Sequence, residues 1–173
     1  MSFPCPGTYM SWQWRGLAVR DRIPVMHDMP PRHEAADTGQ PIAVARARIL
    51  VADDHRVMRE NLVAVLSREH DVVAAVPDAQ ALIEAADGLN PDVLVVDIQM
   101  PGLCGIAAAH SLKGGGCRAK VVFVTTQPER DFVQSCLALG AVGFVVKDRL
   151  ITDLLPAVRS VLLGQSFVSP SLH

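Results

Sequence analysis

The feature that most constrains this chain is an unbroken aliphatic run that ends in a single carboxylate. The run at 93–96 leads directly into Asp97, and a Pro-Gly turn follows at 101–102. A continuous Val/Leu run of this length is typical of a strand buried on both faces, as in a parallel sheet. Asp97 then lies at the carboxyl end of the strand, where open α/β sheets place their ligand sites. A charge there is costly to bury alone, so other charges are expected to converge on it.

Short apolar segments alternate with amphipathic ones along residues 46–165. The segments predicted as strands are 48–52, 72–76, 93–97, 121–124 and 143–146. The segments predicted as helices are 56–69, 78–89, 106–113, 129–139 and 151–163, with Asp78 as a cap and Gly140 and Gly164 as helix ends. This strict alternation predicts a parallel sheet with helices on both faces, because neighbouring parallel strands need a crossover between them.

Length and composition exclude several other classes of protein. A chain of 173 residues suits one domain, and half of its residues are hydrophobic. The net charge of −2 gives no basic field for nucleic acid. No apolar run approaches the roughly 18 residues of a membrane span, and no secretory signal is evident. The four cysteines show no metal-like spacing, which favours reduced thiols and a cytoplasmic location.

Residues 1–45 differ from the rest of the chain. They hold six of the twelve prolines and show no sustained period, so a disordered N-terminal extension is expected. An aromatic cluster of Tyr9, Trp12 and Trp14 among arginines leaves a partner-docking segment as an alternative. A translation start assigned too early is another. Residues 166–173 are expected to form a C-terminal tail.

Charged and polar residues follow four of the five predicted strands. These are Asp53 with Asp54, then Asp97, Thr125 and Lys147. Because the ends of parallel strands meet at one edge of a sheet, we expect these side chains to converge. Three carboxylates would hold Mg²⁺, which prefers oxygen ligands and phosphate partners, so a transferred phosphoryl group is the natural guest. No nucleophilic triad and no glycine-rich nucleotide loop is present in the sequence.

The chain resembles a two-component response-regulator receiver domain over residues 46–165. The motifs that carry the resemblance are Val-Ala-Asp53-Asp54-His, Val-Val-Asp97-Ile-Gln-Met-Pro-Gly, Val-Phe-Val-Thr125-Thr and Gly-Phe144-Val-Val-Lys147-Asp. Their spacings of 44 residues from Asp53 to Asp97 and 22 from Thr125 to Lys147 fit the family. The resemblance implies a flavodoxin-like (CheY-like) doubly wound α/β fold. That fold has a five-stranded parallel sheet of order 2-1-3-4-5 and five helices.

The resemblance also implies a role for each site residue. Asp97 matches the aspartate that accepts a phosphoryl group from a sensor histidine kinase or a phosphotransfer protein. Asp54 and Asp97 match the Mg²⁺ ligands, helped by the backbone carbonyl of Gln99, and Asp53 acts mainly through water. Lys147 matches the lysine that the family places at this site. Self-phosphorylation and slow dephosphorylation are the only catalysis expected.

Thr125 and Phe144 match the pair of switch residues in that family. Phosphorylation of Asp97 would draw Thr125 inward and free space into which the Phe144 ring can rotate. The surface of helix four, strand five and helix five would then change for a downstream protein effector, as a shift in populations. The outer face of the last helix is a candidate homodimer surface.

Three details suggest the NarL-type branch of the family: Asp-Asp-His at 53–55, Lys147 followed by Asp148, and the tail from Gly164. Members of that branch usually continue into a helix-turn-helix. The sequence stops at His173, so no direct DNA binding is expected from this chain. Phe144 departs from the more common Tyr or His, because it has no hydrogen-bonding tip.

Other interpretations of the same residues stay open at this point. Asp53 and Asp54 could cap a helix, and His55 is expected to face solvent at the helix start although it could ligate a metal. Thr126 is a rival or accessory to Thr125. Whole-chain alternatives are a phosphorylation-independent binding module, a transcription regulator whose DNA-binding domain is absent from this chain, and an Mg²⁺-dependent phosphohydrolase. The last usually carries Asp-x-Asp, which Asp97 with its neighbours does not match.

Overall fold

The computed structural model describes residues 46–126 and 142–170. Its elements are β1 (Arg48–Ala52), α1 (Arg56–Leu66), β2 (Asp71–Val76), α2 (Ala79–Leu89), β3 (Val93–Asp97), α3 (Gly105–Gly114), β4 (Lys120–Thr125), β5 (Val142–Val146), the 3-10 helix η1 (Lys147–Arg149), α5 (Leu150–Leu162) and β6 (Phe167–Val168). All five predicted strands are confirmed to within a residue at each end. The predicted helix at 129–139 and the predicted extension at 1–45 lie outside the described residues.

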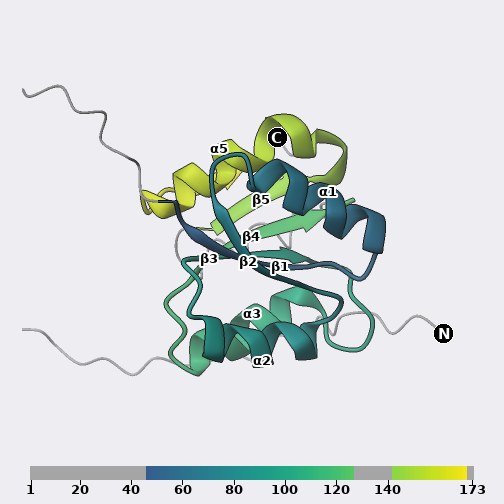
Figure 1. Cartoon of the computed structure of the whole chain (residues 1–173), viewed down its shortest axis with the longest axis vertical. Coiled ribbons are helices and arrows are strands. Elements are labelled where there is room, and N and C mark those ends of the chain that lie inside the picture. The colour runs from purple at the N-terminus through teal and green to yellow at the C-terminus, as the bar shows by residue number, and fades with distance from the viewer. Residues whose placement is uncertain (1–45, 127–141, 171–173) are drawn as a thin grey trace, which may run out of the picture. The chain divides into compact units, whose positions relative to one another are not determined.

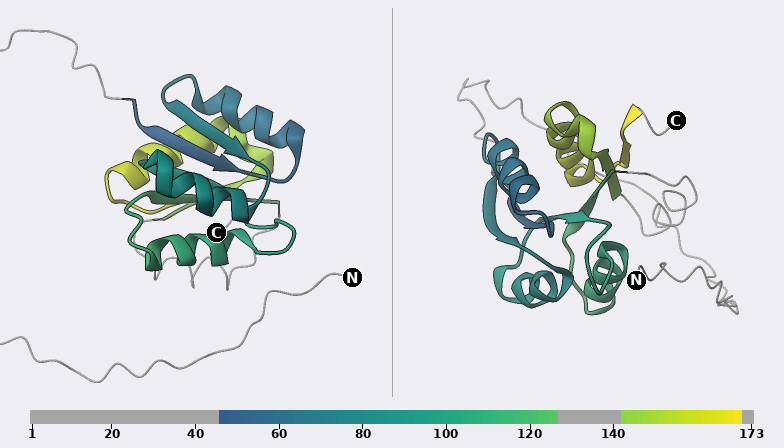
Figure 2. Two further views of the ribbon diagram at one scale, coloured as in Figure 1. Left: turned by 60° about the horizontal axis from the view of Figure 1, so that its bottom comes forward. Right: turned by 90° about the vertical axis from the view of Figure 1, so that its right-hand side faces the viewer.

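The strands form one parallel sheet of order β2-β1-β3-β4-β5-β6. Helices α1 and α5 cover one face, and α2 and α3 cover the other (Figure 1; Figure 2, right). The doubly wound α/β fold and the order of its first five strands are therefore confirmed. No helix within the described ranges combines the length and the apolar character that crossing a membrane would require.

The alternation of side chains along each buried strand divides the core into two layers. In β3, Val93 and Val95 pack with the residues under α1 and α5, while Leu94 and Val96 pack with those under α2 and α3. All four are at most 1% exposed. Since each side chain of β3 meets a helix layer, the continuous aliphatic run is what this central position requires.

The prediction of a five-stranded sheet was wrong, because the segment predicted as a tail adds a sixth strand. Helix α5 ends in a Schellman motif, in which Gln165 N–H donates to Ser160 O and Gly164 adopts φ +77°. The turn brings β6 beside β5, where Phe167 pairs with Gly143 and Val168 with Phe144. Two apolar residues are too few to show a strand period in the sequence.

A buried side-chain network fastens this sixth strand. Ser169 is fully buried, and its Oγ donates to Asp153 Oδ2 on α5 at 2.7 Å. Ser169 Oγ also accepts a hydrogen bond from the N–H of Val146 at 3.3 Å, and the N–H of Ser169 donates to Phe144 O at 2.9 Å. Burial raises the pKa of Asp153, but hydrogen bonds from Arg149, Ser169 and Thr152 outweigh it and leave the pKa below its usual value.

Candidate functional site

Four strands deliver their site residues to one edge of the sheet. Asp97 is the last residue of β3 and Thr125 the last of β4, while Asp53 directly follows β1 and Lys147 directly follows β5. Adjacent pairing of these strands keeps the four ends level. Three of the side chains meet in direct ion pairs, so the predicted convergence is confirmed for them. Thr125 is buried at the same edge.

Lys147 lies between two buried carboxylates. Its Nζ is 2.7 Å from Asp97 Oδ2 and 2.9 Å from Asp53 Oδ2. The side chains of Lys147, Asp53 and Asp97 are only 8%, 0% and 2% exposed. The contact with Asp53 is an ion pair without hydrogen-bond geometry, since that oxygen accepts no hydrogen bond within the described residues. Charges buried this deeply require partners, and the ammonium group supplies one to both acids.

The surroundings shift the pKa values of the central pair. Burial raises the pKa of Asp97, and the hydrogen bonds from Lys147 and from the N–H of Gln99 offset that rise only in part. Burial lowers the pKa of Lys147, but its contacts with Asp97 and Asp53 outweigh burial and leave the pKa above its usual value. Lys147 therefore stays charged, and further positive charge at the site would favour the ionised form of Asp97.

Asp54 and His55 form the outer rim of the site. The Asp54 side chain is 24% exposed, and its Oδ1 lies 2.8 Å from Nδ1 of His55. The N–H of His55 donates to Asp53 Oδ1 at 2.8 Å, in the loop that leads to α1. The expectation that His55 faces solvent is confirmed, since its ring is 74% exposed, and the exposed ring also contacts Asp54.

The donor set fits a divalent cation. One ligand atom from each of Asp53, Asp54, His55 and Asp97 lies within 4.8 Å of the others. Opposite ligands of an octahedral Mg²⁺ are about 4.2 Å apart, so a slight contraction would let these atoms share one ion. Three carboxylates against the single ammonium of Lys147 leave two negative charges. A divalent cation would match that excess.

Gln99 and Thr126 extend the hydrogen bonding of Asp97. The backbone N–H of Gln99 donates to Asp97 Oδ1 at 3.1 Å, which fixes the carboxylate from the side away from Lys147. The hydroxyl of Thr126 donates to the side-chain oxygen of Gln99 at 3.3 Å, and the role of Thr126 as a rival or accessory to Thr125 stays a prediction. The predicted metal contact of the Gln99 carbonyl stays a prediction.

Phe144 occupies the core beneath the site. Its side chain is fully buried, and its ring centroid lies 5.4 Å from that of Phe123 at an interplanar angle of 33°. The ring therefore already lies inward in this structure. The proposed roles of Thr125 and Phe144 as a moving pair stay a prediction.

Two residues near the site were missed by the sequence reasoning. A Cβ atom at Gly105 would lie 2.0 Å from the backbone oxygen of Asp97, so α3 begins closer to the phosphoacceptor candidate than any larger residue allows. Arg59 on α1 donates from Nη1 to the backbone oxygen of Asp53 at 2.6 Å. The glycine was visible only as a loop glycine, and the arginine gave no signal in a helix face of mixed charges.

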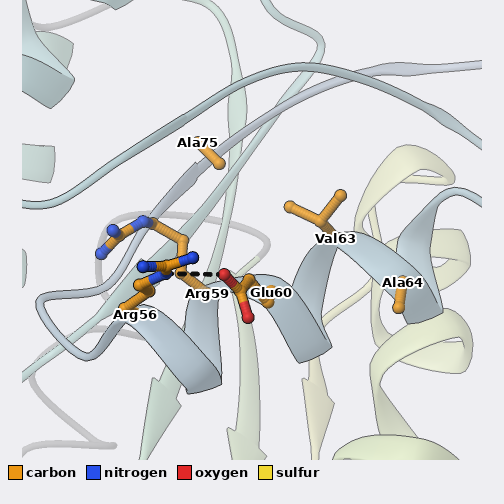
Figure 3. A pocket seen from close by; sticks show the side chains of 6 residues that line it. All are labelled: Arg56, Arg59, Glu60, Val63, Ala64 and Ala75. Carbon is orange, nitrogen blue, oxygen red and sulfur yellow. Dashed lines mark hydrogen bonds and ion pairs between the residues drawn. The ribbon is translucent and has the colours of Figure 1, made fainter.

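A shallow hollow of about 320 Å³ lies beside the site, between α1 and β2. Figure 3 shows its polar end, where Arg56 pairs with Glu60 at 2.8 Å and Arg59 lies alongside. Its apolar end is formed by Val63, Ala64 and Ala75. No nucleophile lines the hollow, and both of its arginines already have hydrogen-bond partners. The candidate functional residues are therefore the acids at the sheet edge and not the residues that line the hollow.

Most of the described part of the chain matches a known family. Residues 49–159 match the response regulator receiver domain. The match includes β2 to β5, all of β1 except Arg48, and the four residues that lie at the sheet edge.

Curated relatives are similar over the same part of the chain. The response regulator GacA of Pseudomonas viridiflava is 32% identical over 127 residues, which cover 72% of this chain and 59% of GacA. The probable transcriptional regulatory protein NarL of Mycobacterium tuberculosis is 33% identical over 129 residues, which cover 73% of this chain and 60% of NarL. The chain thus spans about 60% of the length of these relatives.

Solved structures give the same result for the fold. The signal receiver domain of NarL from Mycobacterium tuberculosis has a TM-score of 0.64 and 31% identity, and the match covers 69% of this chain and 98% of that one. The isolated receiver domain of RcsB from Salmonella enterica, in the presence of a phosphomimetic BeF3⁻, has a TM-score of 0.67 and 26% identity. That match covers 73% of this chain and 96% of the other.

Proposed function

Because this chain belongs to the response regulator receiver domain family, we propose that it is a phosphorylation-driven switch that accepts a phosphoryl group on Asp97. One observation carries the proposal: a buried lysine ammonium bridges Asp97 and Asp53 at the carboxyl edge of the sheet. An aspartate needed only for folding would be expected to have one satisfied partner. Here a second acid is buried beside it, and a divalent cation would balance the excess negative charge of the cluster.

The donor is proposed to be the phosphohistidine of a sensor kinase or of a phosphotransfer protein. A carboxylate oxygen of Asp97 forms a bond to phosphorus as the phosphorus–nitrogen bond to the donor breaks, and the histidine nitrogen takes the electron pair. Bound Mg²⁺ would neutralise charge on the phosphoryl oxygens. Asp53, Asp54 and Asp97 would hold the ion, and Lys147 would pair with a phosphoryl oxygen.

The output is proposed to pass through β5 and α5. The backbone oxygen of Phe144 accepts a hydrogen bond from the N–H of Ser169, and the hydroxyl of Ser169 donates a hydrogen bond to Asp153 on α5. A movement of Thr125 or Phe144 on phosphorylation would therefore displace α5 and change its outer surface as well as displacing β5. A downstream protein effector, or a second copy of the chain, would read the change.

A second candidate function is transcription regulation by a longer protein of which this receiver is one part. The names of NarL and of several other relatives include transcriptional regulation, and the match covers only about 60% of their length. One solved structure of RcsB is described as two dimers bound to two parallel DNAs. In this proposal the receiver controls a DNA-binding part and does not contact DNA itself.

A phosphohydrolase is the weaker rival, and we propose that the chain does not turn over a substrate. Exposed Gln99 occupies the position two residues after Asp97, where enzymes resembling haloacid dehalogenases carry an acid. Only slow loss of the Asp97 phosphoryl group to water is expected.

Intact-mass measurement tests the proposal. The full chain is incubated with acetyl phosphate and Mg²⁺ beside Asp97→Asn and the control Asp87→Asn, which changes an exposed carboxylate on α2. We expect one added phosphoryl group in the wild type and in the control, none in Asp97→Asn, and loss of the gain with EDTA. A wild type that gains nothing under any metal condition would refute phosphoacceptance. Steady release of inorganic phosphate from a small ester would favour the phosphohydrolase.

A further inference from the structure

We infer that His55 is itself a ligand of the divalent cation, and that it gives the site a preference for Mn²⁺ and similar transition metals over Mg²⁺. This inference rests on the metal site of the proposed function and names one more ligand for it. The observation behind it is the juxtaposition of an imidazole with three carboxylates, all with ligand atoms within 4.8 Å of one another.

The backbone places His55 for this role. His55 precedes α1 with an extended conformation, φ −84° and ψ 113°, and its N–H is held by the buried Oδ1 of Asp53. The carbonyl of the same residue accepts the N–H of Arg59 at 2.9 Å, in the first turn of α1. Both ends of the residue are therefore fixed, and the position of its Cβ at the rim of the acidic cluster does not depend on a flexible loop.

The ring itself points toward the acids although it is free to point away. Its side chain is 74% exposed, and its Nδ1 approaches Asp54 Oδ1 to 2.8 Å. An exposed ring can rotate by a small amount at little cost, so the nitrogen can exchange its contact with Asp54 for a contact with an ion bound to Asp54. Buried Asp53, whose Oδ2 accepts no hydrogen bond within the described residues and has Lys147 as its ion-pair partner, would contribute a carboxylate oxygen to the same ion.

A competing role for His55 is to orient Asp54 by a hydrogen bond without touching the metal. Ligating carboxylates are commonly held in this way. The two roles differ in chemistry. An orienting hydrogen bond would help every cation to a similar extent, whereas a nitrogen ligand favours borderline metals, because Mg²⁺ prefers oxygen and imidazole suits transition metals.

The expected effect follows from this difference. Loss of a group that only supports a metal ligand costs about 10–100-fold in affinity, so loss of a ligand should cost Mn²⁺ at least about tenfold. Mg²⁺ would keep its oxygen ligands and replace the imidazole with water, so its affinity should change by less than about threefold. His55→Gln, which retains a hydrogen-bonding side chain, should lose the Mn²⁺ preference as His55→Ala does.

Titration calorimetry of the full chain with Mn²⁺ and with Mg²⁺ tests the inference. The variants are His55→Ala and His55→Gln, with His110→Ala, at an exposed position on α3, as the matched control. Pulsed electron paramagnetic resonance of bound Mn²⁺ gives an independent measurement, since a coordinated imidazole nitrogen modulates the echo. We expect this modulation in the wild type and in the control, and its absence in both His55 variants, together with the selective loss of Mn²⁺ affinity.

Three outcomes would count against the inference. Equal losses for Mn²⁺ and Mg²⁺ would assign His55 the orienting role only. Unchanged affinities would leave it without any role in metal binding. Nitrogen modulation that survives in His55→Ala would assign the nitrogen to another residue. In each case the phosphorylation of Asp97 with Mg²⁺ could still hold, so failure here is distinct from failure of the proposed function, in which neither cation would support a mass gain.

Discussion

Replacing Gly105 with alanine is expected to disturb the backbone at the end of β3, where Asp97 lies. The new Cβ would lie 2.0 Å from the backbone oxygen of Asp97, 2.8 Å from Val96 Cγ1 and 3.0 Å from the carbonyl carbon of Asp97. The nearest atom belongs to the backbone and cannot rotate away. Either α3 or the end of β3 must move.

The size of the shift sets the cost. Non-bonded carbon and oxygen atoms are free of repulsion at about 3.4 Å or more, so the start of α3 and the end of β3 must separate by more than an ångström. The N–H of Gly105 donates to Ile98 O at 3.1 Å, and that bond would lengthen with the same movement. Overpacking of a filled interior costs typically about 1–3 kcal/mol, and a backbone clash should fall at the upper end, about 3 kcal/mol.

Urea unfolding at neutral pH measures this cost, with Gly88→Ala as the matched control. Gly88 is an exposed residue inside α2, and no atom lies within 4 Å of the position that an alanine Cβ would take there. Its replacement should stabilise the chain by about 0.5–1 kcal/mol. The two changes of glycine to alanine should thus have opposite signs. Equal stability of Gly105→Ala and wild type, within about 0.5 kcal/mol, would refute the close approach of α3 to Asp97.

Three further predictions concern the buried charges and polar groups. Lys147→Met should lower the free energy of unfolding by about 3 kcal/mol in the absence of metal, because it leaves two buried carboxylates without their cation. Addition of Mg²⁺ should restore part of this stability in a thermal melt. A variant as stable as the wild type would contradict the ion pairs. Ser169→Ala should cost about 1–3 kcal/mol in urea unfolding, because Asp153 on α5 loses a buried hydrogen-bond donor. Exposed Ser166→Ala should cost almost nothing, and equal effects of the two changes would argue against the fastening of β6. Burial lowers the pKa of His70, so the folded chain binds fewer protons there than the unfolded chain, and the stability present above the unfolded pKa is lost as the pH falls through it. His70→Gln should flatten the fall in stability between about pH 7.5 and pH 5, while the same change at exposed His110 should not.

The convergence of the site was predictable because it depends only on strand ends. A strand that is buried on both faces needs a continuous aliphatic run, and the polar residue that ends the run marks the edge of the sheet. Asp53, Asp97 and Lys147 each follow such a run, so their meeting required no knowledge of side-chain positions. The end of α5 at Gly164 was predictable for a similarly local reason.

The features that escaped prediction depend on distances between elements. The sixth strand has two residues, and it is held by a hydrogen bond between Ser169 and Asp153, which lie 16 residues apart in the sequence. The need for glycine at 105 arises from how closely α3 approaches β3, which no local pattern records. The direction of the His55 ring depends on its contact with Asp54 and on the hydrogen bond from the His55 N–H to the side chain of Asp53. Hydrophobic periodicity and secondary-structure propensity do not record distances between elements or the directions of side chains.

The most direct test of the central claim is to locate the phosphoryl group chemically. After incubation with acetyl phosphate and Mg²⁺, sodium borohydride reduces an aspartyl phosphate to homoserine, and peptide sequencing by mass spectrometry then identifies the altered position. We predict homoserine at position 97 and nowhere else, with none in a sample treated with EDTA. Modification of Asp53 or Asp54 in place of Asp97, or the absence of homoserine in a chain that has gained phosphate, would contradict the account.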